Sequence, residues 1–437
     1  MAHIDSFDSR DPFRPPTLLS LLPLLALLWA ATARGDEAPA AAPSPAPGTE
    51  ESTKKKVASV IGKNVVDNDK DRVHLGPLYP SLAIVSAGAS VAPMVQLWQR
   101  DLGGSGLDVH GAASYSIRQY QFYALRVGRL PHHGTGPPSL TTSSDRLYPL
   151  RDVERLSGAD NKLDLYVAYR HRDYPEEDFY GLGRDSLERD RTDFRLRDDL
   201  VELVGGWHFS PQLGVIASVG LQQTSLGAGR DAAFPDLPSR FDEAAAPGLA
   251  GPPRQLVLMT GALWDRRDEP GNPHRGTLLL ASLSRFEDRR GDTHDFTRTA
   301  TEGRLYVPLG SRRHVLAARA VASFDRPDDG ARVPFYMQSS LGGSHVLRGY
   351  PAFRFRADKL AALSTEYRFE VVPRLELAAF YDLGQVAPVG TALRLSHPLS
   401  GWGGGVRFKS AHRVLARFDV ARSAEGTRYL VKLGPAW

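Results

Sequence analysis

The chain contains no cysteine among its 437 residues. A disulfide framework, a thiolate zinc site and a cysteine nucleophile are therefore excluded. An excess of one charge is also absent, because 54 lysine and arginine residues are opposed by 50 aspartate and glutamate residues, for a net charge of +4. The arginines are spread along the chain rather than gathered in one basic stretch, so a nucleic-acid partner is not predicted.

Long hydrophobic runs and catalytic motifs are missing as well. No apolar run reaches the roughly 20 residues that a membrane-spanning helix requires, and the nucleophile elbow G-x-S-x-G does not occur. His132 and His133 lack a third ligand, and the stretch 265–268 (Asp-Arg-Arg-Asp) is interpreted as part of a polar lumen or rim rather than as an acid–base pair. We therefore expect no enzymatic activity, no cofactor and no metal site.

The N-terminal region has the composition of an export signal followed by a tether. A short apolar run, residues 18–30, leads into Ala31-Thr32-Ala33. Such a run ending in an A-x-A pattern is typical of a secretory signal peptide, so cleavage after Ala33 is predicted, which makes residues 1–33 the signal peptide. Alanine and proline then dominate residues 36–56. Because this composition favours extended chain, residues 34–78 are predicted to be a periplasmic tether and lead-in.

Strand-like alternation characterises the remainder of the chain. In the segment 374–384, leucine, alanine and tyrosine alternate with a set that includes Arg374, Glu376 and Asp382. Period-two alternation places consecutive side chains on opposite faces of a β-strand. The segment 362–370 repeats the pattern. Alternation of this kind fits a soluble sandwich as well as a membrane barrel.

The last segments favour the barrel. Apolar side chains alternate there with Arg413, Arg417 and Asp419, and the sequence ends on Trp437, which keeps the parity of the apolar set. About sixteen such segments between residues 79 and 437 fit an even-numbered antiparallel barrel. Since a strand in hydrocarbon needs partners on both edges, we predict an all-β fold, a closed transmembrane antiparallel β-barrel over residues 79–437.

Two short motifs point to a family. The sequence Val346-Leu347-Arg348-Gly349-Tyr350 is followed by Phe380-Tyr381-Asp382-Leu383-Gly384. An L-R-G-Y tetrad followed by F-x-D-x-G resembles the signature of BamA/TamA-type outer-membrane barrels, the bacterial surface antigen family. The resemblance extends from about residue 80 to the end, and further segments agree with it: residues 179–183, 265–268, 273–276 and 366–368.

The resemblance implies an inward-folded loop. In that family a long extracellular loop enters the barrel, and its arginine meets the aspartate of the second motif. Here the loop would be residues 325–357, with Gly349 permitting a tight backbone and Arg348 donating to Asp382 or Glu366. The alternative is a solvated Arg348 in a surface turn. The predicted loop lock, structural or functional, comprises Arg348, Gly349, Tyr350, Phe380, Asp382, Gly384, Glu366 and Arg368.

The C-terminus resembles the signal by which outer-membrane barrels are recognised for insertion. The apolar set of the last segment supplies this predicted signal, which consists of Tyr429, Val431, Leu433 and Trp437. Family members end more often on phenylalanine, so the terminal tryptophan is a departure.

The family's protein-inserting members carry soluble POTRA modules ahead of the barrel, and none is recognisable here. About 45 residues between the predicted cleavage site and the first strand are too few for one such module. A separate periplasmic partner could supply it. The resemblance implies a bacterial outer-membrane location, contact with outer-membrane lipid, and client outer-membrane or secreted proteins as partners.

Two functions remain open from the sequence. The first is outer-membrane protein assembly or translocation, in which a weakly paired seam between first and last strands opens for a client. The second is a passive or structural barrel that kept the loop lock and lost transport. The glycine-rich stretch 401–405 (Gly-Trp-Gly-Gly-Gly) is expected to weaken packing and permit bending near the end of the barrel.

Overall fold

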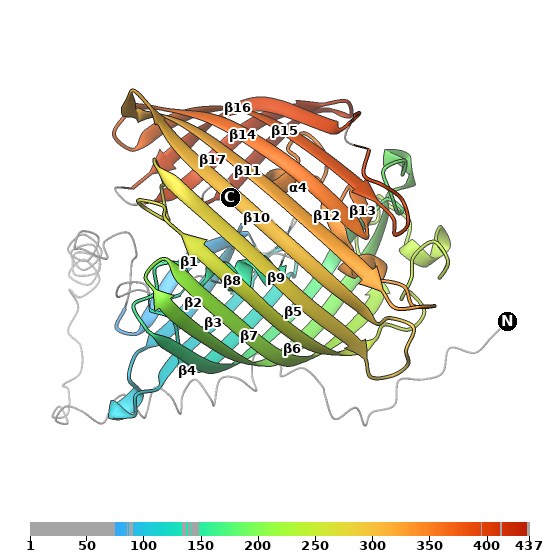
Figure 1. The fold of residues 1–437 in the computed structure, drawn as a ribbon. Coiled ribbons are helices and arrows are strands. Elements are labelled where there is room, and N and C mark those ends of the chain that lie inside the picture. The colour runs from blue at the N-terminus through green and yellow to red at the C-terminus, as the bar shows by residue number, and fades with distance from the viewer. Residues whose placement is uncertain are drawn as a thin grey trace, which may run out of the picture.

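The computed structural model describes residues 75–84, 86, 91–132, 137–138, 140, 148–394, 396–410 and 413–434. The predicted signal peptide, the Pro/Ala-rich stretch 36–56 and Trp437 lie outside these residues. The described chain folds into sixteen strands that form one sheet, in which each strand pairs antiparallel with the next barrel strand along the chain. Figure 1 shows the sheet wrapping around a lumen. The predicted all-β barrel of about sixteen strands is thereby confirmed.

The strands have the following bounds: β1 (Leu78–Ile84), β2 (Val91–Gln99), β3 (Asp108–Tyr115), β4 (Gln121–Arg129), β5 (Leu163–Phe179), β6 (Thr192–Ser210), β7 (Leu213–Ala228), β8 (Arg254–Asp265), β9 (Gly276–Asp288), β10 (Phe296–Leu309), β11 (Ser311–Pro327), β14 (Lys359–Val372), β15 (Leu375–Ala387), β16 (Leu399–Lys409), β17 (Val414–Ser423) and β18 (Gly426–Leu433). Two short strands, β12 (Ser339–Leu341) and β13 (Phe355–Ala357), form a separate two-stranded sheet.

Period-two alternation explains the two faces of the sheet. In β15, Leu377 and Tyr381 are exposed on the outer face, whereas Phe380 and Asp382 are buried on the inner one. The same parity holds around the sheet, with leucine, valine and aromatic residues outside and arginine, glutamate and aspartate inside. An apolar exterior around a charged interior is the distribution that lipid on one side and a polar lumen on the other require.

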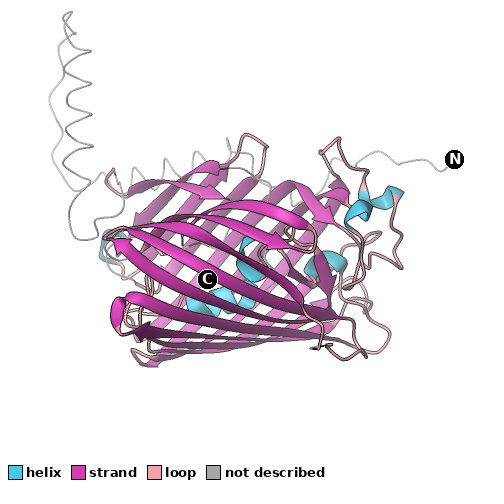
Figure 2. Cartoon of the chain, turned by 90° about the horizontal axis from the view of Figure 1, so that it is seen from above, coloured by secondary structure: helices cyan, strands magenta, loops and turns pink. Residues whose placement is uncertain are grey.

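The connections alternate between the two ends of the barrel because all neighbouring strands are antiparallel. One end has tight turns after Ser210, Leu309 and Val372. The opposite end carries the long segment between β11 and β14, which contains η4 (Phe335–Met337), β12, α4 (Gly343–Val346) and β13. β12 and β13 lie against β15, so this segment folds into the lumen, and Figure 2 shows short helices inside the ring of strands.

A helix between β4 and β5 was not anticipated from the sequence. α3 (Tyr148–Glu154) lies between β4 and β5, at the same end of the barrel as the tight turns, and packs against β8, β9 and β10. Within the described part of the chain, no helix is both long enough and apolar enough to traverse a bilayer.

Candidate functional site

Arg348 lies deep in the lumen and is held by two strands. Its Nε and Nη2 donate to the two carboxylate oxygens of Asp382 in β15, at 2.7 and 2.8 Å, and its backbone N–H donates to the same group at 3.0 Å. Its Nη1 donates to Glu366 in β14 at 2.8 Å. The side chain is 2% exposed, so the structure does not place it in a solvated surface turn. Both acceptors proposed from the sequence are used.

The second motif supplies more than a carboxylate. The Phe380 ring lies 3.5 Å from the Arg348 guanidinium carbon, a cation–π contact in which the ring covers one face of the cation. Gly384 leaves room for the loop, because a Cβ there would stand 2.8 Å from a methyl carbon of Leu341. Phe380, Asp382 and Gly384 share the inner face of β15. The F-x-D-x-G spacing therefore presents an aromatic ring, a carboxylate and a residue without a side chain to the same segment of the loop.

The loop backbone is held at the residue after the arginine. Gly349 has φ +99°, a conformation that L side chains rarely adopt. Its carbonyl accepts a 2.8 Å hydrogen bond from the Ser423 hydroxyl of β17. Tyr350 is buried and packs edge-on against Phe355 of β13, with ring centroids 5.3 Å apart. The tetrad is therefore held to β14 and β15 through its arginine, to β17 through Gly349 and to β13 through Tyr350.

Glu366 is the centre of a larger charged cluster. Besides Arg348 it accepts from Arg368 and Arg407, each at 2.8 Å, so three guanidinium groups share one carboxylate. Arg407 also donates to Asp419 at 3.0 Å, and Arg417 joins Asp419 to the loop by donating to the Ser344 carbonyl at 2.5 Å. The inner-face parity of Arg417 and Asp419 was visible in the sequence, but their connection to the loop was not.

The glycines of β16 have a different role from the one expected. Gly401, Gly403 and Gly405 lie on the inner face, and each occupies a place where a side chain would collide. A Cβ on Gly401 would stand 1.8 Å from the Arg348 carbonyl oxygen, and one on Gly405 would stand 2.1 Å from Asp419 Oδ1. The structure indicates that these glycines let the loop and the charged cluster approach the wall closely.

Replacing Gly401 with alanine should therefore displace the loop and destabilise the barrel by about 1–3 kcal/mol, the usual cost of overpacking. The midpoint of urea unfolding in lipid vesicles measures the effect. Gly205→Ala in β6 is the matched control, because a Cβ there meets nothing within 4 Å. Equal midpoints for the two variants would refute the close-approach explanation.

The barrel is nearly closed, but in the described residues no hydrogen-bonded ladder joins its two edges, so the full closure predicted from the sequence is not seen there. β1 and β18 approach each other, but no pairing joins them. Along β18, the backbone groups of successive residues point alternately toward β17 and toward the open edge. The hydrogen bond from Gly434 N–H to the Leu415 carbonyl shows that the even-numbered residues bond to β17. Thr427, Tyr429, Val431 and Leu433 direct their backbone groups toward the seam.

The β1 edge offers much less. The hydrogen bond from Trp98 N–H to the Pro77 carbonyl shows that Leu78, Pro80 and Leu82 face the seam. Leu78 already exchanges both of its backbone hydrogen bonds with Leu75, which folds back on it. Pro80 has no N–H to donate. The two edges are thus unequal, and a full ladder across the seam has no complete partner on the β1 side.

The residues of the predicted insertion signal lie on this last strand. Tyr429 and Val431 are 71% and 60% exposed on the outer face, while Arg428 and Lys432 point into the lumen. Leu433 shares the outer parity, and Trp437 lies outside the described residues. The role of these residues as an insertion signal stays a prediction.

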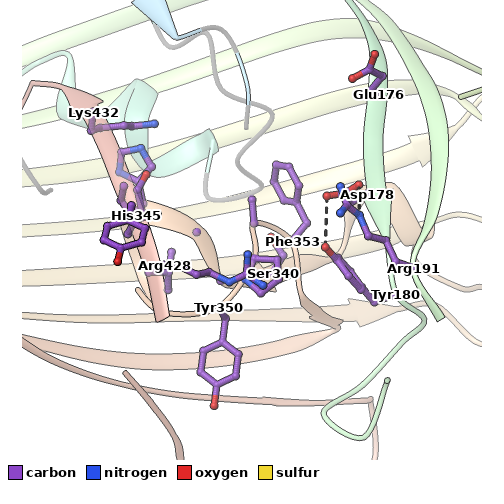
Figure 3. Close-up of a pocket in the computed structure, with 18 of the residues that line it drawn as sticks. Glu176, Asp178, Tyr180, Arg191, Ser340, His345, Tyr350, Phe353, Arg428 and Lys432 are labelled. Atoms are coloured by element: carbon purple, nitrogen blue, oxygen red, sulfur yellow. Dashed lines mark hydrogen bonds and ion pairs between the residues drawn. The ribbon is translucent and has the colours of Figure 1, made fainter. Parts of the chain in front are cut away.

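A cavity of about 620 Å³ separates the inward loop from β18. Figure 3 shows Arg428 and Lys432 of β18 on the same side of the cavity as His345 of the loop, with the Tyr350 ring turned away from them and Asp178 of β5 farther along the wall. Burial, and then the positive charge of Lys432 and neighbouring arginines, holds the pKa of His345 well below its ordinary value, so this imidazole is neutral. The open edge therefore borders a polar space inside the barrel.

Comparison with known proteins identifies the fold. The Omp85 superfamily domain matches residues 160–429. BamA from Haemophilus ducreyi lacking POTRA domains 1-3 is similar in structure, with a TM-score of 0.54, 14% identity, and coverage of 81% of this chain and 68% of that one. CdiB from Escherichia coli, at 14% identity, gives a TM-score of 0.49 over 83% of this chain and 61% of that chain. CdiB from Acinetobacter baumannii gives 0.43 at 12% identity, over 79% and 57%.

The chain thus spans less than two thirds of either CdiB chain. None of the curated proteins matches the sequence. The likeness to BamA concerns the fold, whereas the superfamily match covers more than half of the chain and includes both loop-lock motifs. The chain belongs to the Omp85 superfamily.

Proposed function

We propose that this barrel acts at the bacterial outer membrane in the assembly or translocation of other proteins, without enzymatic chemistry, and that a client chain engages at the seam between β1 and β18. The observation that carries the proposal is the unequal seam. β18 presents the backbone groups of four residues, whereas the β1 edge is occupied at Leu78 and lacks a donor at Pro80. An extended client strand can pair with the β18 edge by main-chain hydrogen bonds.

The exterior supports this location. Leucine, valine and aromatic side chains cover the outer face of the sheet, and β1 places Leu82 on that face at 62% exposure. In a strand that pairs at the seam, successive side chains would face the lipid outside and the charged lumen inside in turn. Outer-membrane lipid, a client protein and a periplasmic partner that delivers it are the proposed partners.

A disulfide staple across the seam tests the proposal. The natural chain has no cysteine, so pairs introduced along β1 and β18 can be screened for crosslinking without background. The stapled protein, reconstituted in liposomes, should lose insertion of an unfolded outer-membrane barrel protein, and dithiothreitol should restore it. The control staple joins Ala281→Cys to Thr301→Cys, which face each other on the paired strands β9 and β10.

Undiminished insertion by the oxidised seam-stapled protein would exclude seam opening. If neither the seam-stapled nor the control-stapled protein inserts the client faster than empty liposomes do, the second function, a passive structural barrel, is favoured. The extensive ion pairing of the lumen is the observation that favours that alternative, because it describes a closed interior rather than a passage.

A further inference from the structure

A second segment enters the lumen from the end opposite the inward loop. α3 follows β4, and its apolar side chains Leu150 and Val153 are 1% and 0% exposed. The wall is shaped to receive them. A Cβ on Gly261 of β8 would stand 2.3 Å from a methyl carbon of Val153, so only glycine leaves room for the helix there. A seat of this kind indicates that the helix belongs in the lumen.

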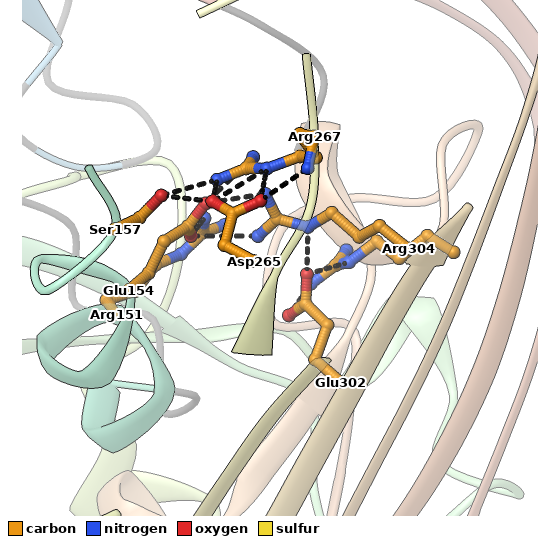
Figure 4. A network of polar contacts seen from close by, with 8 residues as sticks. Arg151, Glu154, Ser157, Asp265, Arg267, Glu302 and Arg304 are labelled. Carbon is orange, nitrogen blue, oxygen red and sulfur yellow. Dashed lines mark hydrogen bonds and ion pairs between the residues drawn. The ribbon is translucent and has the colours of Figure 1, made fainter. Parts of the chain in front are cut away.

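α3 is fastened to the wall by Glu154. This carboxylate accepts two hydrogen bonds from Arg304 of β10, at 2.6 and 2.8 Å, in a bidentate pair. Arg151 of the same helix donates at 3.2 Å, and Arg267 lies 3.6 Å away. Burial alone would raise the pKa of Glu154, but the surrounding guanidinium groups hold it at about 2. Figure 4 shows the arrangement, with Asp265 and Ser157 completing the partners of Arg267.

The ion-pair network extends from Arg304 to the inward loop. Arg304 donates to Glu302 at 2.6 Å, and Glu302 accepts two hydrogen bonds from Arg319 of β11, both at 2.8 Å. Arg319 then donates to the His345 carbonyl of α4 at 2.6 Å. Arg304, Glu302 and Arg319 are each buried, so water does not weaken these links. Leu150 and Val153 of α3 also share one buried apolar cluster with Val346 and Leu347 of the loop.

We propose that α3 is a second plug, latched to the inward loop through the relay Glu154–Arg304–Glu302–Arg319–His345 carbonyl, so that release of either plug loosens the other. The inference does not depend on the proposed function, because it concerns the lumen and not the seam. It follows from two features: the relay is continuous, and its last link grips the backbone three residues before Arg348. A change at α3 therefore acts on the loop lock from the opposite mouth of the barrel.

Hydrogen–deuterium exchange of the reconstituted full chain tests the coupling. Glu154→Gln keeps the shape of the side chain and removes the charge that Arg304 requires. Exchange in residues 343–350 should rise by about 5- to 150-fold, the range usual for coupled sites. The control is Asp198→Asn, which breaks a more deeply buried pair with Arg172 in β5 and β6, away from the relay. That control should leave residues 343–350 unchanged.

The reverse experiment distinguishes coupling from a purely local structural role of Glu154. Because coupling free energy is symmetric, Arg348→Lys should raise exchange in residues 148–157. Faster exchange confined to the segment that carries the substitution, in both variants, would overturn the proposal. If Glu154→Gln does not fold, Arg304→Lys keeps one positive charge without the bidentate grip, and it should raise exchange in both segments. Exchange raised in α3 alone would again overturn the coupling.

Discussion

Replacing Glu366 with glutamine should destabilise the barrel more than any other single substitution in the lumen. Arg348, Arg368 and Arg407 all donate to this carboxylate, whose side chain is 0% exposed. Removing one partner of a buried ion pair costs on the order of 3–5 kcal/mol, because the remaining charge stays buried without compensation. Here three cations lose the negative charge that they share, so the upper end of that range is expected.

Urea unfolding in phospholipid vesicles, followed by tryptophan fluorescence, measures this loss. Glu287→Gln is the control, since Glu287 pairs with Arg285 at 3.8 Å on the surface. Exposed pairs contribute about 0–1 kcal/mol. A Glu366→Gln barrel whose midpoint matches that of the control would show that water reaches the cluster and screens it.

Arg348→Ala should both destabilise the barrel and open it. The substitution leaves Asp382 buried without its bidentate partner and removes the cation from the Phe380 ring, so a loss on the order of 3–5 kcal/mol is expected. The loop then loses its attachment to β14 and β15, and single-channel conductance in planar bilayers should rise. Arg348→Lys retains a positive charge without the planar guanidinium group, so its stability and conductance should lie between those of the natural protein and of Arg348→Ala.

A double-mutant cycle with Asp382→Ala isolates the contact. Residues in one ion-pair network show interaction energies of about 0.5–3 kcal/mol. Additive effects of the two substitutions, together with an unchanged current for Arg348→Ala, would contradict a role for this pair in holding the loop inside the barrel.

Much of the wall could be predicted from the sequence because barrel strands obey a strict local rule. Phe380 and Asp382 had to share a face once β15 was recognised as a strand, and the outward parity of Tyr381 had to follow. The proximity of Arg348 to Asp382 came from the resemblance between two motifs rather than from the residues alone. Composition and periodicity do not measure how far a loop reaches into a lumen.

The parts that the sequence did not reveal depend on contacts between distant segments. α3 is seven residues long, which is too short for a helical period to stand out. Its seat at Gly261 and its partner Arg304 belong to strands far along the chain. The glycines at 401 and 405 were interpreted as points of bending. The groups that approach them, a loop carbonyl and Asp419, are distant in sequence and cannot be identified from the residues next to the glycines.

The arginine cluster also bears on which ions could leak through a partly opened lumen. Around the loop lock, the ion pairs of Arg348, Arg368, Arg407 and Arg417 join four guanidinium groups to the three carboxylates of Glu366, Asp382 and Asp419. An aqueous path past this cluster would thus run beside more cationic than anionic groups. Rings of arginine select for anions in pores, so a residual current through this barrel should be carried by chloride in preference to potassium.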